Sequence, residues 1–338
     1  MRLRDNVIQA LEHKETLWIP SIYTDIDFME QTALNELYRG KEAGYDDWGV
    51  HFTYVPIAGA PMVTPGSYIL QDIKEWKDKV KIPDIDSFDW KEAALRDTAS
   101  WDRENKFSVI MLSYGPFERV QTLLSIEKAL IAFLTEPEAV SEFIGEFVEY
   151  RIKMIDKIVQ YYKADAIMVF DDYGMGSNMF LPPDVWRKVI KPHLKRHVEA
   201  AHEKGLYYIQ HSDGYIEPIF KDFIEIGVDA AQPVEYVNNT PELKKKYGRQ
   251  ITFCSGHKAD KTLDNPNAAE EQMRADVRSV LNELGKGGSY MAFPEVVSRR
   301  GQEIFFEELR KINEPKMIKA GVKLPDWSSV ASRFKDQI

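Results

Sequence analysis

The sequence has almost no cysteine, no long apolar run and no excess of basic charge. One cysteine in 338 residues excludes a disulfide within the chain and is typical of a reducing compartment. No apolar stretch approaches the roughly 18 residues that a membrane-spanning helix needs. The first residues turn charged again after a few apolar positions. We therefore expect no secretory signal, no membrane partner and a cytoplasmic protein.

Two further absences exclude common binding classes. Lys and Arg total 44 against 54 Asp and Glu, a net charge of −10, which disfavours a nucleic-acid-binding surface. The glycines at 285–289 have the spacing of neither a dinucleotide turn nor a P-loop. Hydrophobic residues make up 44% and charged residues 29%, as in an ordinary globular protein with a large core.

Short apolar segments alternate with longer amphipathic ones along the chain. Most of the short segments are almost continuously apolar, as expected for strands of a parallel sheet that is buried on both faces. The eight predicted strands are 17–22, 48–54, 107–113, 166–172, 206–212, 228–235, 251–256 and 289–295. Helical spacing predicts helices over 117–134, 136–162, 184–204, 215–226, 240–247, 266–284 and 301–312.

Eight strand–helix units predict a (β/α)₈ TIM barrel in a single domain over 1–338. Residues 55–106 exceed what a minimal barrel needs and contain four prolines and several aspartates. We expect this segment to be an insertion after the second strand that forms a lid over the barrel mouth.

Polar residues end nearly every predicted strand, and in a barrel those ends meet at one pocket. They are Tyr23, Asp25, His51, Tyr114, Glu118, Asp171, Asp172, Tyr173, His211, Asp213, Glu235, Cys254, His257 and Glu295. Imidazole, carboxylate and thiolate are zinc ligands. One candidate set is His211, Glu235 and either Cys254 or His257. A second set is Glu30 and His51, with Glu15 as a third candidate. Spacing alone leaves both sets open.

Several segments resemble the uroporphyrinogen decarboxylase superfamily, which contains porphyrinogen decarboxylases and corrinoid-dependent methyltransferases. They are 170–205, beginning FDDYGMGS, 211–235, beginning HSDGYIEP, 243–260, and the glycine pair before the last strand. The resemblance covers roughly 105–312 and implies a (β/α)₈ barrel. Barrels of this family are often dimers, so a homodimer is an expected arrangement.

The residues distinguish the branches of that superfamily. The segment IYTDIDFMEQT after the first predicted strand carries three acids and no arginine, so it would repel a polyanionic tetrapyrrole. Thiol-demethylating members carry zinc on His-x-Cys and a later Cys. This chain has His211-Ser212-Asp213 and no cysteine near Phe293.

A third branch fits better. Segments 46–66 and 69–90 look like the ether-cleaving methyltransferase component of anaerobic O-demethylases. A zinc motif Glu-x14-Glu-x20-His is associated with that group, and Glu15, Glu30 and His51 stand at that spacing. The resemblance implies transfer of a methyl group from a methoxylated aromatic compound to the cobalt(I) of a separate corrinoid protein. This chain lacks the Asp-x-His-x-x-Gly pattern that binds a corrinoid.

These considerations predict the site residues. Asp172, Tyr173 and His211 are the predicted catalytic residues, because the phenolate leaving group needs an acid. The predicted metal ligands are Glu30, His51, His211 and Glu235, with zinc as the metal. The predicted substrate contacts are His51, Tyr54, Phe180, Glu235 and His257. The alternatives are another methyl donor or acceptor, a porphyrinogen decarboxylase, and a non-catalytic escort of a corrinoid protein.

Overall fold

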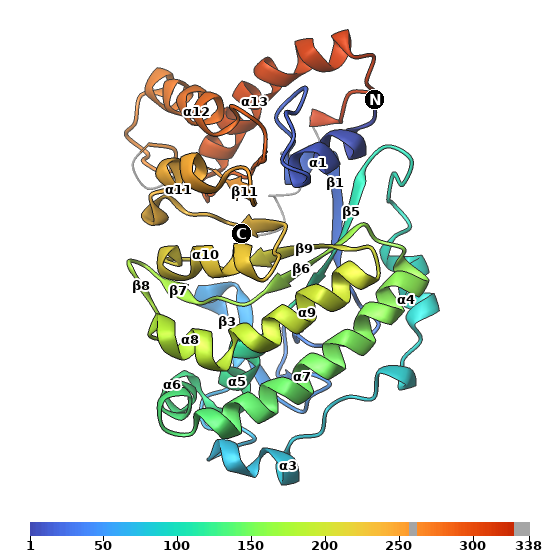
Figure 1. The fold of residues 1–338 in the computed structure, drawn as a ribbon, viewed down its shortest axis with the longest axis vertical. Coiled ribbons are helices and arrows are strands. Elements are labelled where there is room, and N and C mark those ends of the chain that lie inside the picture. The colour runs from blue at the N-terminus through green and yellow to red at the C-terminus, as the bar shows by residue number, and fades with distance from the viewer. Residues whose placement is uncertain (257–261, 328–338) are drawn as a thin grey trace.

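A seven-stranded parallel sheet forms the centre of the molecule, in a computed structural model that describes residues 1–256 and 262–327 (Figure 1). The strand order is β1-β5-β6-β9-β10-β11-β12. The bounds are β1 Ile26–Glu30, β5 Phe107–Leu112, β6 Ala166–Phe170, β9 Tyr207–His211, β10 Ala230–Gln232, β11 Thr252–Ser255 and β12 Tyr290–Ala292. Because the strands are parallel, their carboxyl ends lie at one edge of the sheet.

In β5 to β12 of the main sheet, alternate residues enter two different apolar cores. In β5, Phe107 and Val109 join a cluster with Ile209, Ala230 and Cys254, whereas Ile110 and Leu112 pack with the surrounding helices. Both faces of the sheet are therefore buried, which explains the continuous apolar runs in the sequence. Helix α1 (Leu3–Leu11) contributes Val7, Ala10 and Leu11 to the first cluster.

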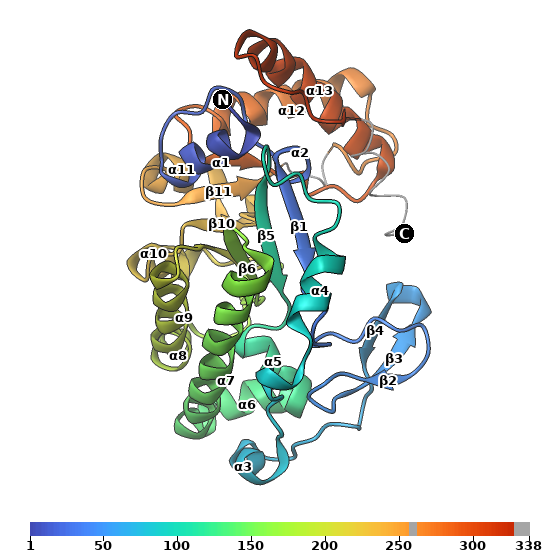
Figure 2. The same cartoon turned by 90° about the vertical axis from the view of Figure 1, so that its right-hand side faces the viewer.

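Helices connect successive strands and cover the outer face (Figures 1 and 2). They are α5 Pro116–Leu124, α6 Ile126–Thr135, α7 Pro137–Lys157, α8 Pro183–Val189, α9 Lys191–Glu203, α10 Glu217–Glu225, α11 Thr240–Tyr247, α12 Glu270–Leu284 and α13 Arg299–Lys319. The helix predicted over 117–134 is two helices, because Ser125 has a φ of 93° and begins α6 by accepting a hydrogen bond from the Lys128 N–H. A π-helical turn, Ile158–Tyr162, extends α7 to the predicted end.

The first part of the sheet differs from the prediction. Segment 17–22 contributes only a single parallel bridge, between Ser21 and Ala292 of β12. The short helix α2 (Ile22–Asp25) follows, and β1 then pairs with β5. The described residues thus show a curled parallel sheet of the TIM-barrel type. Closure into eight strands stays a prediction.

The predicted strand 48–54 does not lie in this sheet. It forms β3 (His51–Val55) of a separate antiparallel sheet with β2 (Gly44–Tyr45) and β4 (Ala60–Val63). In β3 only Phe52 is buried, so the strand has one apolar face rather than two. Figure 2 shows this small sheet standing away from the main body.

The rest of the expected lid packs mainly against the outer helices. Trp76 of α3 (Trp76–Lys79) meets Phe143 of α7 edge to face, with ring centroids 5.7 Å apart. Trp90 of α4 (Trp90–Asp97) meets Tyr162 in the same way, at 6.4 Å. These contacts hold α3 against α7 and α4 against its π-helical extension, so they do not show a lid over the carboxyl ends of the strands. Among the described residues, no helix combines the length and apolarity that crossing a bilayer requires.

Candidate functional site

Asp172, His211 and Asp213 come together where β6 and β9 end. Nε2 of His211 lies 3.5 Å from Oδ1 of Asp172 and 3.6 Å from Oδ1 of Asp213. Their ligand atoms all lie within 4.8 Å of one another, and no other trio of His, Cys, Asp or Glu in 1–256 and 262–327 does so. We call these three residues the His–Asp–Asp group. Its geometry suits a metal ion.

Neighbouring strands orient the imidazole of His211. The parallel register places Phe170 and Gln232 beside it, one on each side. The Phe170 ring stacks on the imidazole with centroids 4.0 Å apart. Nδ1 lies 2.6 Å from Oε1 of Gln232 and donates its proton to that oxygen. In the neutral ring, Nε2 therefore carries a lone pair and faces the two carboxylates.

More carboxylates surround this group. Glu235, after β10, accepts a hydrogen bond of 2.5 Å from the Gly214 N–H. Glu295, after β12, accepts one of 3.0 Å from the Gly256 N–H, and burial raises its pKa to about 8. Burial and the nearby carboxylates of Asp171 and Asp172 raise the pKa of Glu118 well above its ordinary value. The site thus has a strong excess of negative charge, which favours a bound cation or proton.

Asp171 and Tyr173 flank Asp172 but point into the protein. The buried carboxylate of Asp171 accepts hydrogen bonds from the Phe117 and Glu118 N–H groups and so caps α5. Burial raises its pKa to about 7. Tyr173 is 2% exposed, its ring packs against Trp186, and burial raises the pKa of its hydroxyl well above 10. Of the predicted catalytic residues, Asp172 and His211 lie in the His–Asp–Asp group and Tyr173 lies behind it.

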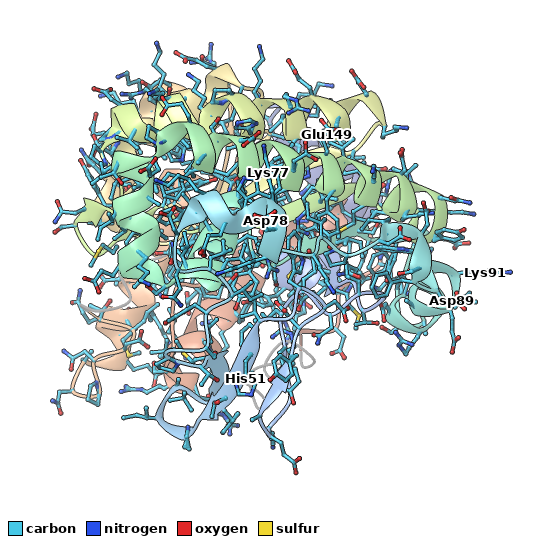
Figure 3. All side chains as sticks on the ribbon, turned by 90° about the horizontal axis from the view of Figure 1, so that it is seen from below. His51, Lys77, Asp78, Asp89, Lys91 and Glu149 are labelled. Carbon is cyan, nitrogen blue, oxygen red and sulfur yellow. The ribbon has the colours of Figure 1, made fainter. Side chains whose placement is uncertain are left out.

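The second predicted ligand set is divided among other contacts. Glu30 ends β1, where it pairs with Arg39 and accepts a hydrogen bond from Ser113. His51 and Tyr54 lie in β3 of the small sheet. The His51 ring (Figure 3) contacts Tyr45 with centroids 4.7 Å apart. Glu15 lies against Gly288, near the amino ends of the strands. Among the described residues, these three form no ligand group.

The remaining predicted residues have mixed placements. Phe180 packs against Phe117 at 5.7 Å and follows the β7–β8 hairpin (Gly174–Met175 and Asn178–Met179). Cys254 is buried in the inner apolar cluster, where burial raises the pKa of its thiol, so it does not join the His–Asp–Asp group. His257 lies outside the described residues.

The sequence prediction missed two roles. Asp213 is among the strand-end candidates but not among the predicted metal ligands, although it follows His211 by two positions. Gln232 was absent altogether. Its signal was its position at the end of the strand next to His211, which becomes clear only once the register is known.

Comparison with known proteins places this fold. The model of the family described as uroporphyrinogen decarboxylase (URO-D) matches residues 45–294. The chain belongs to this family. Among curated proteins, none matches the chain.

Among solved structures, a methyltransferase from Methanosarcina mazei shares the fold of this URO-D family chain. The match covers 92% of this chain and 99% of that one, with a TM-score of 0.62 and 14% sequence identity. The flavin-binding domain of baker's yeast flavocytochrome b2 aligns over 96% of this chain and 79% of its own, at 14% identity. Its TM-score of 0.25 is too low to indicate a common fold. The first match supports the TIM-barrel-like architecture.

Proposed function

We propose that this URO-D family chain is a methyltransferase that moves a methyl group from an aryl methyl ether to the cobalt(I) of a separate corrinoid protein. The observation that carries the proposal is the His–Asp–Asp group, set among Glu118, Glu235 and Glu295. A metal-binding, acidic site suits the activation of a neutral ether. The fold shared with the Methanosarcina mazei methyltransferase supports the same reaction class.

The charge of the site argues against decarboxylation of a porphyrinogen. Such a substrate carries several carboxylates and needs cations to hold it. Arg119, the arginine that lies closest to Glu118 in the chain, is fully buried and already paired with Asp46 at 3.0 Å. Arg39 is paired with Glu30. These two arginines therefore offer no free guanidinium group, and a polyanion would meet the carboxylates of Glu118, Glu235 and Glu295.

The His–Asp–Asp group fits zinc. Two carboxylates facing the lone pair of Nε2 repel it unless a cation or a proton lies between them. The hydrogen bond from Nδ1 to Gln232 is the outer contact that metal-bound imidazoles usually make. The ion would be held by Asp172, His211 and Asp213. The Glu235 carboxylate is near enough to Asp213 to raise its pKa. When bound, zinc supplies a Lewis acid that stabilises negative charge on a leaving oxygen.

The chain's own residues bind the ring and move the proton. The carbon–oxygen bond breaks as the methyl group passes to cobalt, and the oxygen keeps the bonding pair and takes a proton. Asp172 and His211 would hold the ion and so cannot also give this proton, and Tyr173 is buried with a raised pKa. The proposed donor is Glu118, because burial and the carboxylates of Asp171 and Asp172 raise its pKa well above the ordinary value. Phe170 and Phe180 offer aromatic surface for the substrate ring, and Tyr54 would approach it from the small sheet.

The corrinoid comes on a partner protein, because the sequence contains no corrinoid-binding pattern of its own. A closed barrel, a cytoplasmic location and a homodimer complete the proposal. Residues 55–106 remain the proposed insertion within one domain. Because α3 and α4 pack along α7, the proposed covering part is the small sheet (β2 to β4), which would reach toward the partner.

The test is a methyl-transfer assay with zinc analysis on the same preparation. The protein is mixed with cobalt(I) cobalamin and a panel of methoxyphenols, and methylcobalamin is followed by its absorbance. We expect turnover with about one zinc per chain. We expect the His211→Ala variant to bind no zinc and to transfer methyl groups at least about 100-fold more slowly.

The matched control is His51→Ala, which removes an imidazole from the small sheet. It should retain zinc and change mainly the KM for the ether. If His51→Ala instead loses zinc while His211→Ala retains it, the ligand assignment is wrong. Decarboxylation of a porphyrinogen without methyl transfer from any ether would refute the proposed reaction.

A further inference from the structure

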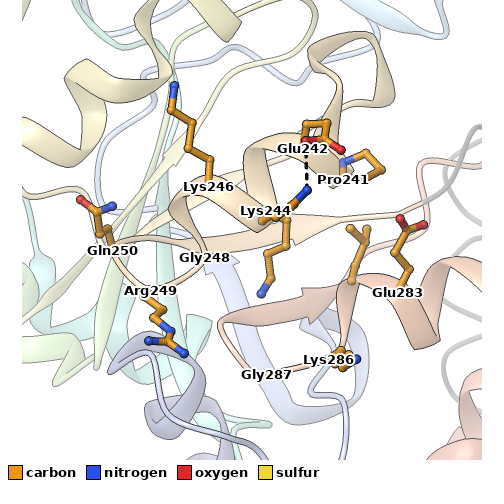
Figure 4. A pocket seen from close by; sticks show the side chains of 12 residues that line it. Pro241, Glu242, Lys244, Lys246, Gly248, Arg249, Gln250, Glu283, Lys286 and Gly287 are labelled. Atoms are coloured by element: carbon orange, nitrogen blue, oxygen red, sulfur yellow. Dashed lines mark ion pairs between the residues drawn. The ribbon is translucent and has the colours of Figure 1, made fainter.

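A second pocket, far from the His–Asp–Asp group, is lined by more basic than acidic side chains (Figure 4). It lies between the end of α11 with the loop that leads into β11, and the loop that leads into β12. Its volume is about 640 Å³. Both loops precede their strands, so the pocket is at the amino ends of the sheet. The His–Asp–Asp group is at the carboxyl ends.

The charge of this pocket is opposite to that of the whole chain. Five basic side chains line it, from Lys244, Lys245, Lys246, Arg249 and Lys286, against the acids Glu242 and Glu283. The whole chain has a net charge of −10. Composition therefore does not explain the basic lining.

Most of these cations have no acidic partner. Lys245 pairs with Glu242 at 4.0 Å, and Lys246 lies over the Tyr247 ring. Lys244 is partly buried, and its Nζ donates a hydrogen bond of 2.8 Å to the carbonyl oxygen of Gly288. No ion pair is seen for Lys244, Arg249 or Lys286 within 1–256 and 262–327. Gathered cations without counter-ions repel one another, and a bound anion removes that cost.

The chemistry of the lining selects the anion. A guanidinium fork with several ammonium groups matches the oxygens of phosphate, which carries more than one charge. The volume lies within the range of about 300–1,000 Å³ found for small-molecule sites. We propose that this pocket binds a small phosphate-bearing anion, held by Lys244, Arg249 and Lys286.

The probe is inorganic pyrophosphate, titrated calorimetrically into the full chain at low salt. We expect one saturable site. In the double variant Arg249→Met/Lys286→Met, the Kd should rise by about tenfold or more, because two charge-assisted contacts are lost. Both side chains are exposed, so the thermal unfolding midpoint should not change.

The matched control is Lys77→Met/Lys91→Met, which removes the same charge from α3 and α4 (Figure 3). Its Kd for pyrophosphate should equal that of the unmodified chain. An equal loss in the control would show only a diffuse charge effect and overturn the site. A pyrophosphate titration without saturable heat would also overturn the site. Tighter binding of citrate than of pyrophosphate would overturn the phosphate assignment.

Discussion

At the scale of single residues, a buried arginine fixes the segment that leads to the site. Nη1 of Arg151 lies 2.6 Å from Oε2 of Glu36, and both side chains are about 1% exposed. Its Nη2 donates hydrogen bonds to the carbonyl oxygens of Ser113 and Tyr114, directly after β5. One side chain thus joins α7, the loop after β1 and the end of β5.

Replacing Arg151 by Met should lower the free energy of unfolding by about 3–5 kcal/mol, because Glu36 would remain buried without its cation. Urea denaturation measures this change. The control is Arg196→Met, which removes an exposed partner of Glu149 and should barely move the midpoint. Equal effects of the two substitutions would contradict the assigned role of burial.

His197 should make stability depend on pH. Burial, with a smaller effect of Arg151, lowers the pKa of its imidazole from 6.5 to about 3. The unfolded chain therefore takes up a proton between pH 6.5 and 3 that the folded chain does not, so stability falls as the pH falls through this window. Relative to His197→Gln, the unmodified chain should lose about 2 kcal/mol between pH 7 and 5.

Urea denaturation of both proteins at pH 7, 6 and 5 tests this difference. The comparison cancels the titration of the other groups that the two chains share. A difference that stays constant with pH would show that the folded protein accepts the proton on His197.

At the scale of elements, the two loops that carry Asp172 and Asp213 touch through glycine. A Cβ on Gly174 would lie 2.4 Å from the Tyr215 backbone nitrogen and 2.7 Å from the carbonyl carbon of Gly214. Both contacts are with backbone, so the loops must separate to admit a methyl group. This contact therefore helps to set the spacing of the His–Asp–Asp group.

Gly174→Ala should weaken zinc binding and methyl transfer by about tenfold or more, since small displacements of ligands are costly. Gly176→Ala is the control in the same hairpin, because its Cβ would meet nothing within 4 Å, although its φ of 46° adds some strain. Zinc titration and assay of both variants measure the difference. Equal zinc affinity in the two would refute the role of the loop contact.

The elements also show what sequence patterns can reveal. Six predicted strands coincide with strands of the sheet, because burial on both faces leaves a continuous apolar run. β1, with sequence IDFME, escaped prediction since Phe28, Met29 and Glu30 are only partly buried and acidic residues interrupt its apolar run at Asp27 and Glu30. The apolar segment 17–22 resembled a strand but makes one bridge. The pattern of apolar residues in a segment indicates how buried the segment is, but it does not indicate which strand it pairs with.

At the scale of the whole molecule, the site depends on register between distant segments. His211 and Asp172 were predictable because both end apolar strands. The exclusion of Glu30 and His51 from the group was not, because it depends on how 31–106 folds between β1 and β5. That segment places His51 on a separate sheet and binds Glu30 to Arg39. The match of Glu15, Glu30 and His51 to the Glu-x14-Glu-x20-His spacing therefore does not predict that the three side chains lie together.

Zinc should stabilise the whole chain through the His–Asp–Asp group. A ligand at about 100 times its Kd adds about 2.7 kcal/mol to folding, and chelation with EDTA should remove this increment. The Asp213→Asn variant tests this assignment, because its stability relative to the unmodified chain should change in opposite directions without and with zinc. Without metal, the variant should be as stable as the unmodified chain or more stable, because one carboxylate less faces Asp172 and Glu235. When zinc is added, the Asp213→Asn variant should gain little stability.

The exposed control Asp184→Asn should keep the full stabilisation by zinc. Thermal unfolding of the three proteins with EDTA and with zinc measures both signs. A full zinc response in Asp213→Asn would place the ion elsewhere, and a loss of stability without metal would show that Asp213 serves the fold.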